Sequence, residues 1–475
     1  MSSWEWETFA SLLNNGTFTI SDVGPLRSPL RSFTIRRDEK LHIVLETKAE
    51  QNARSSVPDH PLGTVRVNAD TVLFSGPLGR AVAHGVQPKS HAATISSNPA
   101  EGESREASDV NSLEVTLTRK EKPIAYVIEW LANLDGPFVW PHFTKVKTEK
   151  IETRRLHDFA NGIDLKSSDE SEGQARNCVR FSVDGHTIYL GTCMLPDAQI
   201  AAKPGFVLYE GDPSREFRMR IVDCLSFALG VYLVRLGWSS LNEDSELVAC
   251  SANRGYALSN RAFELPAQPP APLGLKYQYE IDPAFLSRVV SALYKHYDSL
   301  RLGPLCWAYW HAAAATPHIA AVHYGAAVEA LQAAYLEAHK GAIKTALIEN
   351  DAWRALRGKF HAALDELSVN KELRQVLRNK IGTFNNPPQA VITERLLEVL
   401  KLQFGEREKN AWKRRNDAGH GNEIDSDDYI ELIRDIKLLR IRLHKLLFAM
   451  TGASDSYNDD FTMGHAVRKL GEAIC

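Results

Sequence analysis

The sequence predicts an α+β protein in which a β-rich amino-terminal half precedes an all-α carboxy-terminal half. Short runs of Val, Ile, Thr and Leu, bounded by Gly, Pro, Asp and Asn, fill the first half and are typical of strands. Apolar residues at helical spacing fill the second half. Between the halves, Pro266–Pro272 favours an extended chain that lacks several backbone donors. The expected parts are a β-rich module at 1–265, with room for two subdomains, a proline-rich linker at 266–276 and an α-helical domain at 277–475.

Strands are expected where β-branched and apolar residues stand between turn residues. In the first half these strands are Ser32–Arg36, Leu41–Thr47, Gly63–Phe74 and Ser112–Thr118. A hairpin is expected at Asp184-Gly185, because glycine tolerates positive φ in a tight turn. The strands that flank this turn are Val179–Ser182 and Thr187–Leu190.

Two polar segments and one apolar segment interrupt this strand pattern. Gly85–Asn111 and Lys166–Arg176 are rich in Ser, Glu and Asp, so we expect mobile loops there. The segment Arg215–Gly237 has the helical period and predicts a buried helix. Its periodic residues are Phe217, Ile221, Leu225, Ala228, Tyr232 and Leu236.

The second half predicts a succession of helices. The candidates are Phe285–Leu300, Pro317–His339, Ala352–Leu367, Lys371–Ile381, Thr393–Phe404, Glu406–Ala418 and Asp427–Met450. The last is the strongest, because Asp425 and Ser426 can cap its start and acidic residues suit the positive end of its dipole. Its apolar stripe is expected to contain Leu432, Ile433, Ile436, Leu439, Leu443, Leu446 and Leu447.

Composition and charge exclude several classes of protein. The chain has 475 residues, which suggests roughly three domains, and its 56 Lys and Arg against 59 Asp and Glu give a net charge of −3. A globally basic nucleic-acid coater is therefore excluded, and any contact with nucleic acid must be local. Residues 1–20 lack the pattern of a signal peptide, and no apolar run reaches the roughly 20 residues of a membrane span. The six cysteines form no CxxC pair, so we expect a reduced, cytoplasmic protein without a membrane partner.

The most informative string for chemistry runs from Lys409 to Gly421. The familiar phosphate-loop, dinucleotide, GxSxG and HExxH motifs are absent from the sequence. In this string Arg415 precedes His420 by five positions, and glycines bracket the histidine where a helix must stop. We therefore expect a guanidinium and an imidazole together at the mouth of two packed helices.

An Arg–His pair at that position suits RNA cleavage by the 2′-hydroxyl. This reaction needs a group of near-neutral pKa to move a proton, and a cation to stabilise charge on the phosphorus. His420 has the first property, and the planar donors of Arg415 match phosphate oxygens. Lys409, Lys413 and Arg414 would supply local positive charge for RNA binding. Trp412 could stack on a base or pack in the core, which is the commoner role for a helical aromatic residue.

The string Arg415-Asn416-Asp417-Ala418-Gly419-His420 resembles the RxxxxH motif of HEPN-domain ribonucleases. In that family a polar residue often follows the arginine, and Asn416 fits. The stretch Ala320–Tyr335 resembles the earlier HEPN helix that carries an acidic residue, here Glu329. The resemblance covers roughly residues 285–450. More loosely, Tyr126–Asn133 and Leu225–Gly237 resemble stretches of ApeA-like abortive-infection proteins.

The resemblance implies an activity, partners and a role for each half. It implies an endoribonuclease without metal or cofactor, in which Arg415, Asn416 and His420 are catalytic and Glu329 supports them. It implies a homodimer or higher homo-oligomer, with an Arg–His pair from each subunit in one composite cleft. The products would be a 2′,3′-cyclic phosphate and a 5′-hydroxyl, and the RNA could be a tRNA or an mRNA. The amino-terminal module would regulate the nuclease in antiviral defence by abortive infection, in response to a phage-derived trigger.

An arginine with four to six residues between it and a histidine also occurs elsewhere in the chain. Only the pair at 415 and 420 combines a helix end, a following polar residue and an amphipathic helix behind it. The other pairs are Arg37–His42, Arg54–His60, Arg180–His186 and Arg354–His361.

Other functions stay open at this point. Arg415 and His420 could simply favour the dipole of a helix end, and Glu329 could be a solvated helix residue. The chain could then be a non-catalytic, HEPN-like dimerisation module that binds a nucleotide or a partner. Alternatively, a β-rich ligand-binding function could lie wholly before Pro266.

Overall fold

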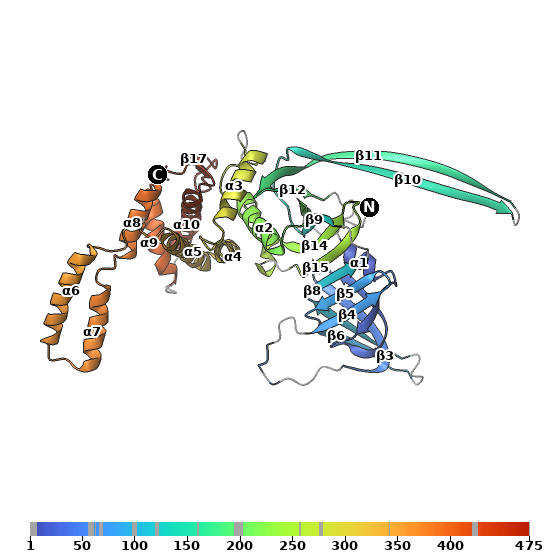
Figure 1. The fold of residues 1–475 in the computed structure, drawn as a ribbon, viewed down its shortest axis with the longest axis horizontal. Coiled ribbons are helices and arrows are strands. Elements are labelled where there is room, and N and C mark those ends of the chain that lie inside the picture. The colour runs from blue at the N-terminus through green and yellow to red at the C-terminus, as the bar shows by residue number, and fades with distance from the viewer. Residues whose placement is uncertain are drawn as a thin grey trace. The chain divides into compact units, whose positions relative to one another are not determined.

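The chain folds into a β-rich unit followed by a helical unit, as the sequence predicts at this coarse level (Figure 1). The first unit contains Met1–Pro269 and Leu273–Ser291, and the second contains Pro270–Pro272 and Ala292–Cys475. The structure is a computed structural model. It describes residues 7–55, 61, 63–65, 70–96, 102–118, 123–158, 161–193, 203–255, 258–274, 279–341, 343–419 and 426–474.

Eleven of the described strands form one large antiparallel sheet in the first unit. Its central strands have an apolar sequence; β9, for example, is buried over its last five residues. In spatial order the strands are β1 (Thr19–Asp22), β4 (Thr71–Gly76), β5 (Gly79–His84), β8 (Ser112–Leu117), β15 (Leu247–Asn253), β14 (Arg235–Asn242), β9 (Ile124–Leu131), β13 (Gly205–Glu210), β12 (His186–Thr192), β11 (Asn161–Val183) and β10 (His142–Asp158).

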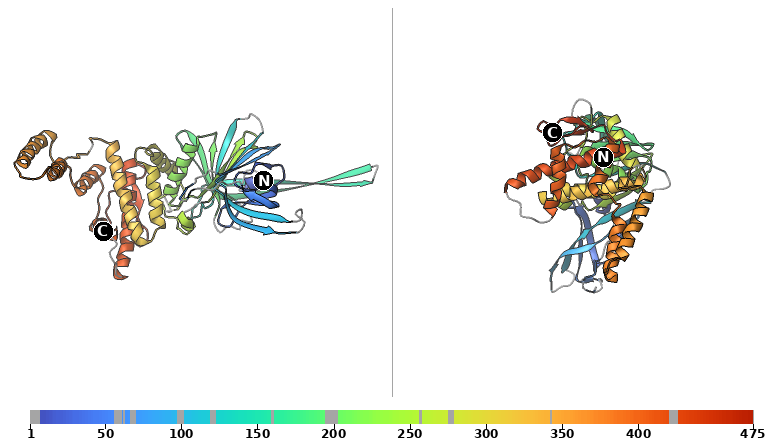
Figure 2. Two further views of the ribbon diagram at one scale, coloured as in Figure 1. Left: turned by 90° about the horizontal axis from the view of Figure 1, so that it is seen from below. Right: turned by 90° about the vertical axis from the view of Figure 1, so that its left-hand side faces the viewer.

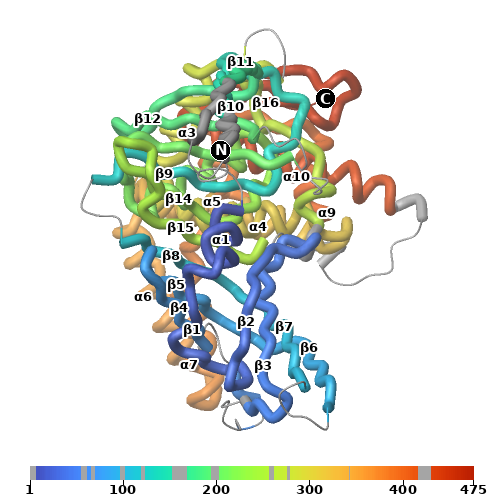
Figure 3. Tube along the Cα trace, turned by 90° about the vertical axis from the view of Figure 1, so that its right-hand side faces the viewer, coloured from blue at the N-terminus to red at the C-terminus, as the bar shows by residue number. Residues whose placement is uncertain are grey.

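A second antiparallel sheet packs on the first. Its strands lie side by side in the order β2 (Arg27–Arg37), β3 (Ile43–Ser55), β7 (Glu103–Val110) and β6 (Gln87–Thr94), as Figure 3 shows. Phe33 of β2 contacts Phe74 of β4, with ring centroids 5.1 Å apart. Helix α1 (Thr8–Leu13) adds Phe9 and Leu13 to the same core. Burial of these apolar faces stabilises the sheet pair at about 25 cal/mol per Å².

The two polar segments expected to be loops are strands, so that prediction was wrong. Gly85–Asn111 contains β6 and β7, and Lys166–Arg176 lies within β11. In β7 every second side chain is buried, and the others are half-buried or exposed. The buried positions include Ser104, Glu106 and Ser108, so the sequence does not show the apolar alternation that is typical of a strand. The expected strand at Gly63–Phe74 is shorter, since β4 begins at Thr71 and residues 63–65 lie outside any strand.

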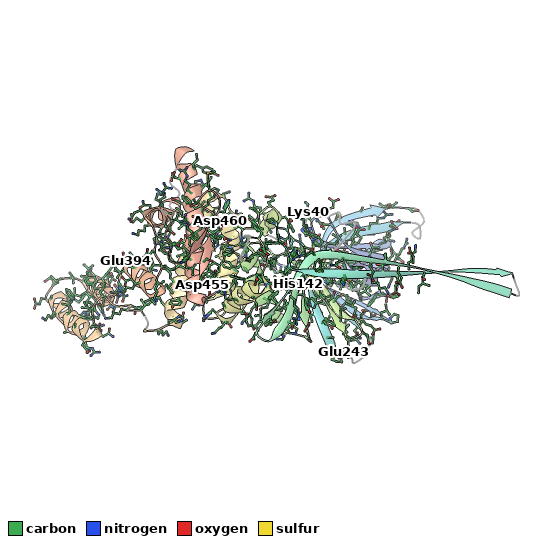
Figure 4. The ribbon with its side chains drawn as sticks, turned by 90° about the horizontal axis from the view of Figure 1, so that it is seen from above. Lys40, His142, Glu243, Glu394, Asp455 and Asp460 are labelled. Atoms are coloured by element: carbon green, nitrogen blue, oxygen red, sulfur yellow. The ribbon has the colours of Figure 1, made fainter. Side chains whose placement is uncertain are left out.

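Strands β10 and β11 form a long two-stranded ribbon. They pair residue by residue from Phe143 with Arg176 to Asp158 with Asn161. Only Cys178–Val183 of β11 also pairs with β12, across the expected turn at Asp184-Gly185. His142, labelled in Figure 4, marks the end of β10 at the sheet, where its Nδ1 accepts a hydrogen bond from the backbone N–H of Arg180 at 2.9 Å.

Helix α2 (Arg215–Leu229) is shorter than the helix expected at 215–237. It ends at Gly230, whose φ of +64° is left-handed, and a Cβ there would meet the Gln268 carbonyl oxygen at 2.0 Å. The apolar residues after Gly230 continue into β14 instead. Arg218 of α2 and Arg235 of β14 share the buried carboxylate of Glu129, at 2.8 and 2.7 Å.

The second unit is built mainly from helices. Helix α3 (Pro283–Lys295) enters this unit at Ala292. The elements that follow are α4 (Leu302–Ala314), α5 (Pro317–Ala338), α6 (Asn350–Asp365), α7 (Lys371–Thr383), α8 (Gln389–Leu400), α9 (Glu406–Gly419), α10 (Ser426–Thr451), β16 (Ser456–Asn458) and β17 (Val467–Lys469). Helix α5 packs beside α4, α9 and α10 (Figure 2), whereas α6 and α7 form a hairpin that packs mainly on itself.

Seven of the expected helices are confirmed, with changed ends. Helix α8 ends before Phe404 because Lys401 adopts a left-handed φ of +55°. Helix α4 was not expected. In α10 most of the expected stripe is buried, but Ile433 is exposed, which corrects its place in the core.

Candidate functional site at the end of helix α9

Buried polar contacts fix the start of α9 against α10. Glu408 is buried, and its carboxylate accepts hydrogen bonds from the backbone N–H groups of Gly405 and Ile474 at 2.8 and 3.0 Å. Lys445 of α10 lies 3.3 Å from the same carboxylate. Because removing one partner of a buried ion pair costs about 3–5 kcal/mol, this pair holds the two helices in one register.

One turn before its end, α9 presents Arg415 to α5. The Arg415 Nη2 pairs with the carboxylate of Glu329, and its Nη1 donates to the Trp412 carbonyl oxygen at 2.6 Å. The Arg415 side chain is 14% exposed and that of Glu329 is 47% exposed. The arginine is therefore held at the edge of solvent by a carboxylate that solvent can reach.

Gly325 makes room for this arginine. It lies one turn before Glu329 on α5, and a Cβ at its position would meet Cδ of Arg415 at 2.9 Å. That distance is too short for an ordinary carbon contact. The path of the Arg415 side chain across α5 thus depends on the absence of a side chain at residue 325.

A stack of cations and aromatic rings lies behind Arg415. The Arg415 guanidinium carbon is 3.5 Å from the centre of the Trp412 ring. Arg442 of α10 lies 4.5 Å from the centre of the same ring and 4.4 Å from that of Phe404. Such cation–π contacts stabilise the arrangement by about 0.5–2 kcal/mol each.

Arg442 is a buried cation. It is 3% exposed, and its Nε has no hydrogen-bond partner among the described residues. Burial lowers the pKa of Arg442 to about 10; Glu408 opposes this effect and Arg415 adds to it. At neutral pH Arg442 therefore stays protonated and adds positive potential beside Arg415.

The residues predicted from sequence are found in different environments. The expected contact of Glu329 with Arg415 is present. Trp412 is half-buried under that arginine. The backbone of Asn416 belongs to α9, but its side chain and the whole of His420 lie outside the described residues.

The three residues expected to bind RNA are not equivalent. Lys409 pairs with Glu406 at 2.9 Å on the surface of α9. Arg414 forms a two-point contact with Asp435 of α10, at 2.8 and 2.6 Å. Lys413 is exposed. Arg414 therefore also has a structural role, which the sequence pattern did not indicate.

Sequence reasoning missed Arg442 and the Glu408–Lys445 pair. A signal was present, because 442 and 445 fall on the buried period of α10, four residues after Leu438 and Ile441. Charged residues at positions that should be apolar indicate a buried polar cluster.

An exposed apolar patch lies on the first turns of α5 and α10. The ring of His318 on α5 lies 6.2 Å from that of Tyr429 on α10, so the two starts are adjacent. We call the following residues the α5–α10 patch: Ile319, Val322, Tyr429, Ile430 and Ile433. Val322, Gly325 and Glu329 are spaced three and four residues apart, so the patch and the Arg415 contact lie on one face of α5.

The described residues contain neither a candidate metal site nor a candidate membrane-spanning helix. Among them, no group of three or more His, Cys, Asp or Glu side chains is arranged to hold a metal ion. None of the described helices combines the length and the apolar character needed to span a membrane. Comparisons with protein-family models and with curated proteins find no match to the chain.

Proposed function

We propose that this chain is a HEPN-type endoribonuclease that cuts RNA without a metal ion, at a site formed by Arg415, Asn416 and His420 with Glu329 in support. The observation that carries the proposal is the ion pair between Arg415 and Glu329, which come from helices 86 residues apart in sequence. The sequence predicts both residues as members of this site. Because the Arg415 guanidinium binds the Glu329 carboxylate, it would also bind an anionic phosphate oxygen.

The proposed reaction is an internal transfer of the phosphoryl group. The 2′-oxygen attacks the adjacent phosphorus and loses its proton to one imidazole, while the bond from phosphorus to the 5′-oxygen breaks. The leaving 5′-oxygen takes a proton from a second imidazole. The products are a 2′,3′-cyclic phosphate and a 5′-hydroxyl, and each imidazole is His420 of one of two subunits.

Arg415 would stabilise the charge that develops on the phosphoryl oxygens. Its guanidinium is oriented by Trp412 and Glu329, so little reorganisation is needed when RNA binds. Arg442 would strengthen this effect by its positive charge, from the other side of the half-buried Trp412 ring, without contact with RNA. Asn416 would orient the phosphate or the imidazole.

The α5–α10 patch supports the dimeric part of the proposal. The five exposed apolar side chains lie on two adjacent helix starts beside a charged site, and apolar surface of this kind is typical of an interface. A two-fold axis through the patch would bring the ends of the two α9 helices to one cleft.

The substrate would be single-stranded RNA, such as a tRNA anticodon loop or an mRNA. Unstacked bases leave the 2′-hydroxyl free to align with the phosphorus, whereas an A-form duplex does not. The β-rich unit would act as the sensor or restraint of the nuclease in abortive infection, with a phage-derived trigger. This regulatory role rests on analogy to a family.

The experiment compares RNA cleavage by wild type, Arg415→Ala and His420→Ala in EDTA, with total RNA and with purified tRNA. We expect cleavage by wild type only, with cyclic phosphate ends found by mass spectrometry. Arg354→Ala is the matched control, because Arg354 also precedes a histidine, His361, but lies exposed on α6.

Equal inertness of wild type and both variants in extracts of phage-infected cells would contradict the nuclease. Cleavage that EDTA abolishes would contradict the metal-free mechanism. A stable dimer without cleavage would favour the second candidate, a non-catalytic interaction module, for which the intramolecular pairing of Arg415 with Glu329 would be the resting structure.

A further inference from the structure

The other face of α9 lines a groove that the proposed catalytic site does not use. Arg407, Asn410 and Arg414 recur every three or four residues, and so lie on one face of the helix. The groove has a volume of about 530 Å³ and runs between α9 and α10. Its other lining residues are Glu431, Arg434, Asp435, Leu438, Phe461 and Thr462.

The charges of this α9–α10 groove leave one guanidinium available. Asp435 neutralises Arg414, and Glu431 pairs with Arg434. Arg407 is exposed and forms no ion pair with any described residue. The groove therefore has a net positive charge, with a free cation at the end distant from Arg415.

The wall opposite α9 is rigid and partly aromatic. Asp459 accepts hydrogen bonds from the backbone N–H groups of Phe461 and Thr462, both at 3.0 Å. Asp460, labelled in Figure 4, pairs with Arg440 of α10 at 3.1 Å. These contacts fix Phe461 as a half-buried ring at the edge of the groove. An aromatic ring and a free cation in one groove are the combination on which single-stranded nucleic acids bind, by stacking and by phosphate contact.

The position of the groove connects it to the candidate site. Arg407 and Arg414 are seven residues apart, so the groove extends about 10 Å along α9. That length spans about three nucleotides of a stacked strand. The groove ends at Arg414, whose neighbour in sequence is Arg415.

We propose that the α9–α10 groove binds the nucleotides of single-stranded RNA that flank the cleaved bond on one side. This inference rests on the proposed nuclease function and adds a subsite to it. Arg407 contacts a phosphate, Asn410 donates to a sugar or base oxygen, and Phe461 stacks on a base. The groove thereby extends substrate recognition beyond the scissile phosphate.

The test uses the full-length protein and two RNA substrates, a trinucleotide in which one of the two linkages is the cleaved bond and a 12-nucleotide single strand. Arg407→Ala should raise the KM for the 12-mer about tenfold with little change in kcat, and should not affect the trinucleotide. Fluorescence anisotropy in the His420→Ala background measures the affinity for the 12-mer at several salt concentrations. The plot of log affinity against log salt should be less steep by about 0.7 in Arg407→Ala, because one phosphate contact is removed. Arg407→Lys should restore most of the affinity.

Arg354→Ala is the matched control, since it removes an exposed arginine from α6, away from the groove residues in sequence. An unchanged KM and salt slope in Arg407→Ala, with cleavage still dependent on Arg415, would overturn the groove alone. Binding of RNA that depends on Arg407, without cleavage by wild type, would support the groove and overturn the nuclease. No binding of the 12-mer by wild type would overturn both.

Discussion

At the residue scale, the candidate site depends on a side chain that is absent. Gly325 lets Arg415 cross α5 and reach Glu329. Glycine in a helix interior costs about 1 kcal/mol relative to alanine. The helix tolerates this cost where the Arg415 side chain passes over it, as expected of a site that positions an arginine.

The first prediction therefore concerns Gly325→Ala. The added methyl group should displace Arg415 and lower RNA cleavage about 100-fold, because misplacement of a catalytic group by about 1 Å has an effect of that size. The melting temperature should not fall in proportion, since alanine favours the helix. Gly358→Ala in α6 is the control, because nothing lies within 4 Å of a Cβ there. A Gly325→Ala enzyme with wild-type cleavage would exclude this positioning.

The second prediction concerns His444, which is fully buried and whose Nε2 lies 3.0 Å from the Tyr309 hydroxyl. Burial, and then the charge of Arg440, keep the pKa of His444 well below its ordinary value of 6.5. The unfolded state therefore binds more protons than the folded state below about pH 6.5. Stability should be fully present above that pH and fall on acidification, by up to about 1.4 kcal/mol per pH unit.

The measurement is the melting temperature between pH 7.5 and 5. We expect His444→Phe to show a weaker decline than wild type. His318→Gln, which changes an exposed histidine, should decline like wild type. Parallel declines of wild type and His444→Phe would show that His444 does not cause the effect.

At the element scale, the starts of α5 and α10 carry the surface on which the proposed dimer would depend. Ile430 is 55% exposed and has the largest exposed fraction in the α5–α10 patch. Ile430→Glu should raise the Kd of the dimer at least about 30-fold, because a charge would be buried in an apolar interface. Light scattering during gel filtration measures this change, and cleavage should fall with the dimer if the site is composite.

Val376→Glu is the control, since Val376 has the same 55% exposure but lies on α7. This variant should remain dimeric. A dimer of Ile430→Glu as stable as the wild-type dimer would place the interface elsewhere.

The elements also show which sequence patterns carry structural information. The helices of the second half could be predicted because α5 and α10 bury apolar residues with a regular period. Strands β7 and β11 could not, because β7 buries Ser104 and Glu106, and the part of β11 at 168–174 pairs only with β10 and is exposed at every position. Composition indicates loops in such cases, although the backbone hydrogen bonds form a ladder.

The candidate site was predictable in part for a similar reason. Arg415 and Glu329 could be proposed because a motif and a helix pattern mark them. The stack of Trp412 and Arg442 could not be predicted, since it depends on how α9 and α10 pack. The α9–α10 groove could not be predicted either, because Phe461 and Thr462, more than forty residues after α9, complete its lining. Neighbours that are distant in sequence leave no periodic signal.

At the scale of the whole molecule, each unit has a core of its own. Leu45 is fully buried in the β-rich unit, and Leu446 is fully buried in the helical unit. Leu→Ala at such positions costs about 2–5 kcal/mol. We predict two transitions in scanning calorimetry: Leu45→Ala should lower only one, and Leu446→Ala only the other. A single transition that both variants shift equally would show that the units unfold together.

The β10–β11 ribbon and the rest of the large sheet differ in how soon they can form during synthesis. The ribbon begins with Asp158 paired to Asn161, only three positions later in the sequence, and such hairpins close within about 1–10 μs. Thr116 of β8 instead pairs with Ala249 of β15, 133 positions later. At about 5–20 residues per second, β8 waits roughly 7–27 seconds for that partner to leave the ribosome. Through that interval β8 has an open edge, so the nascent chain is most prone to aggregation before its last sheet strand is made.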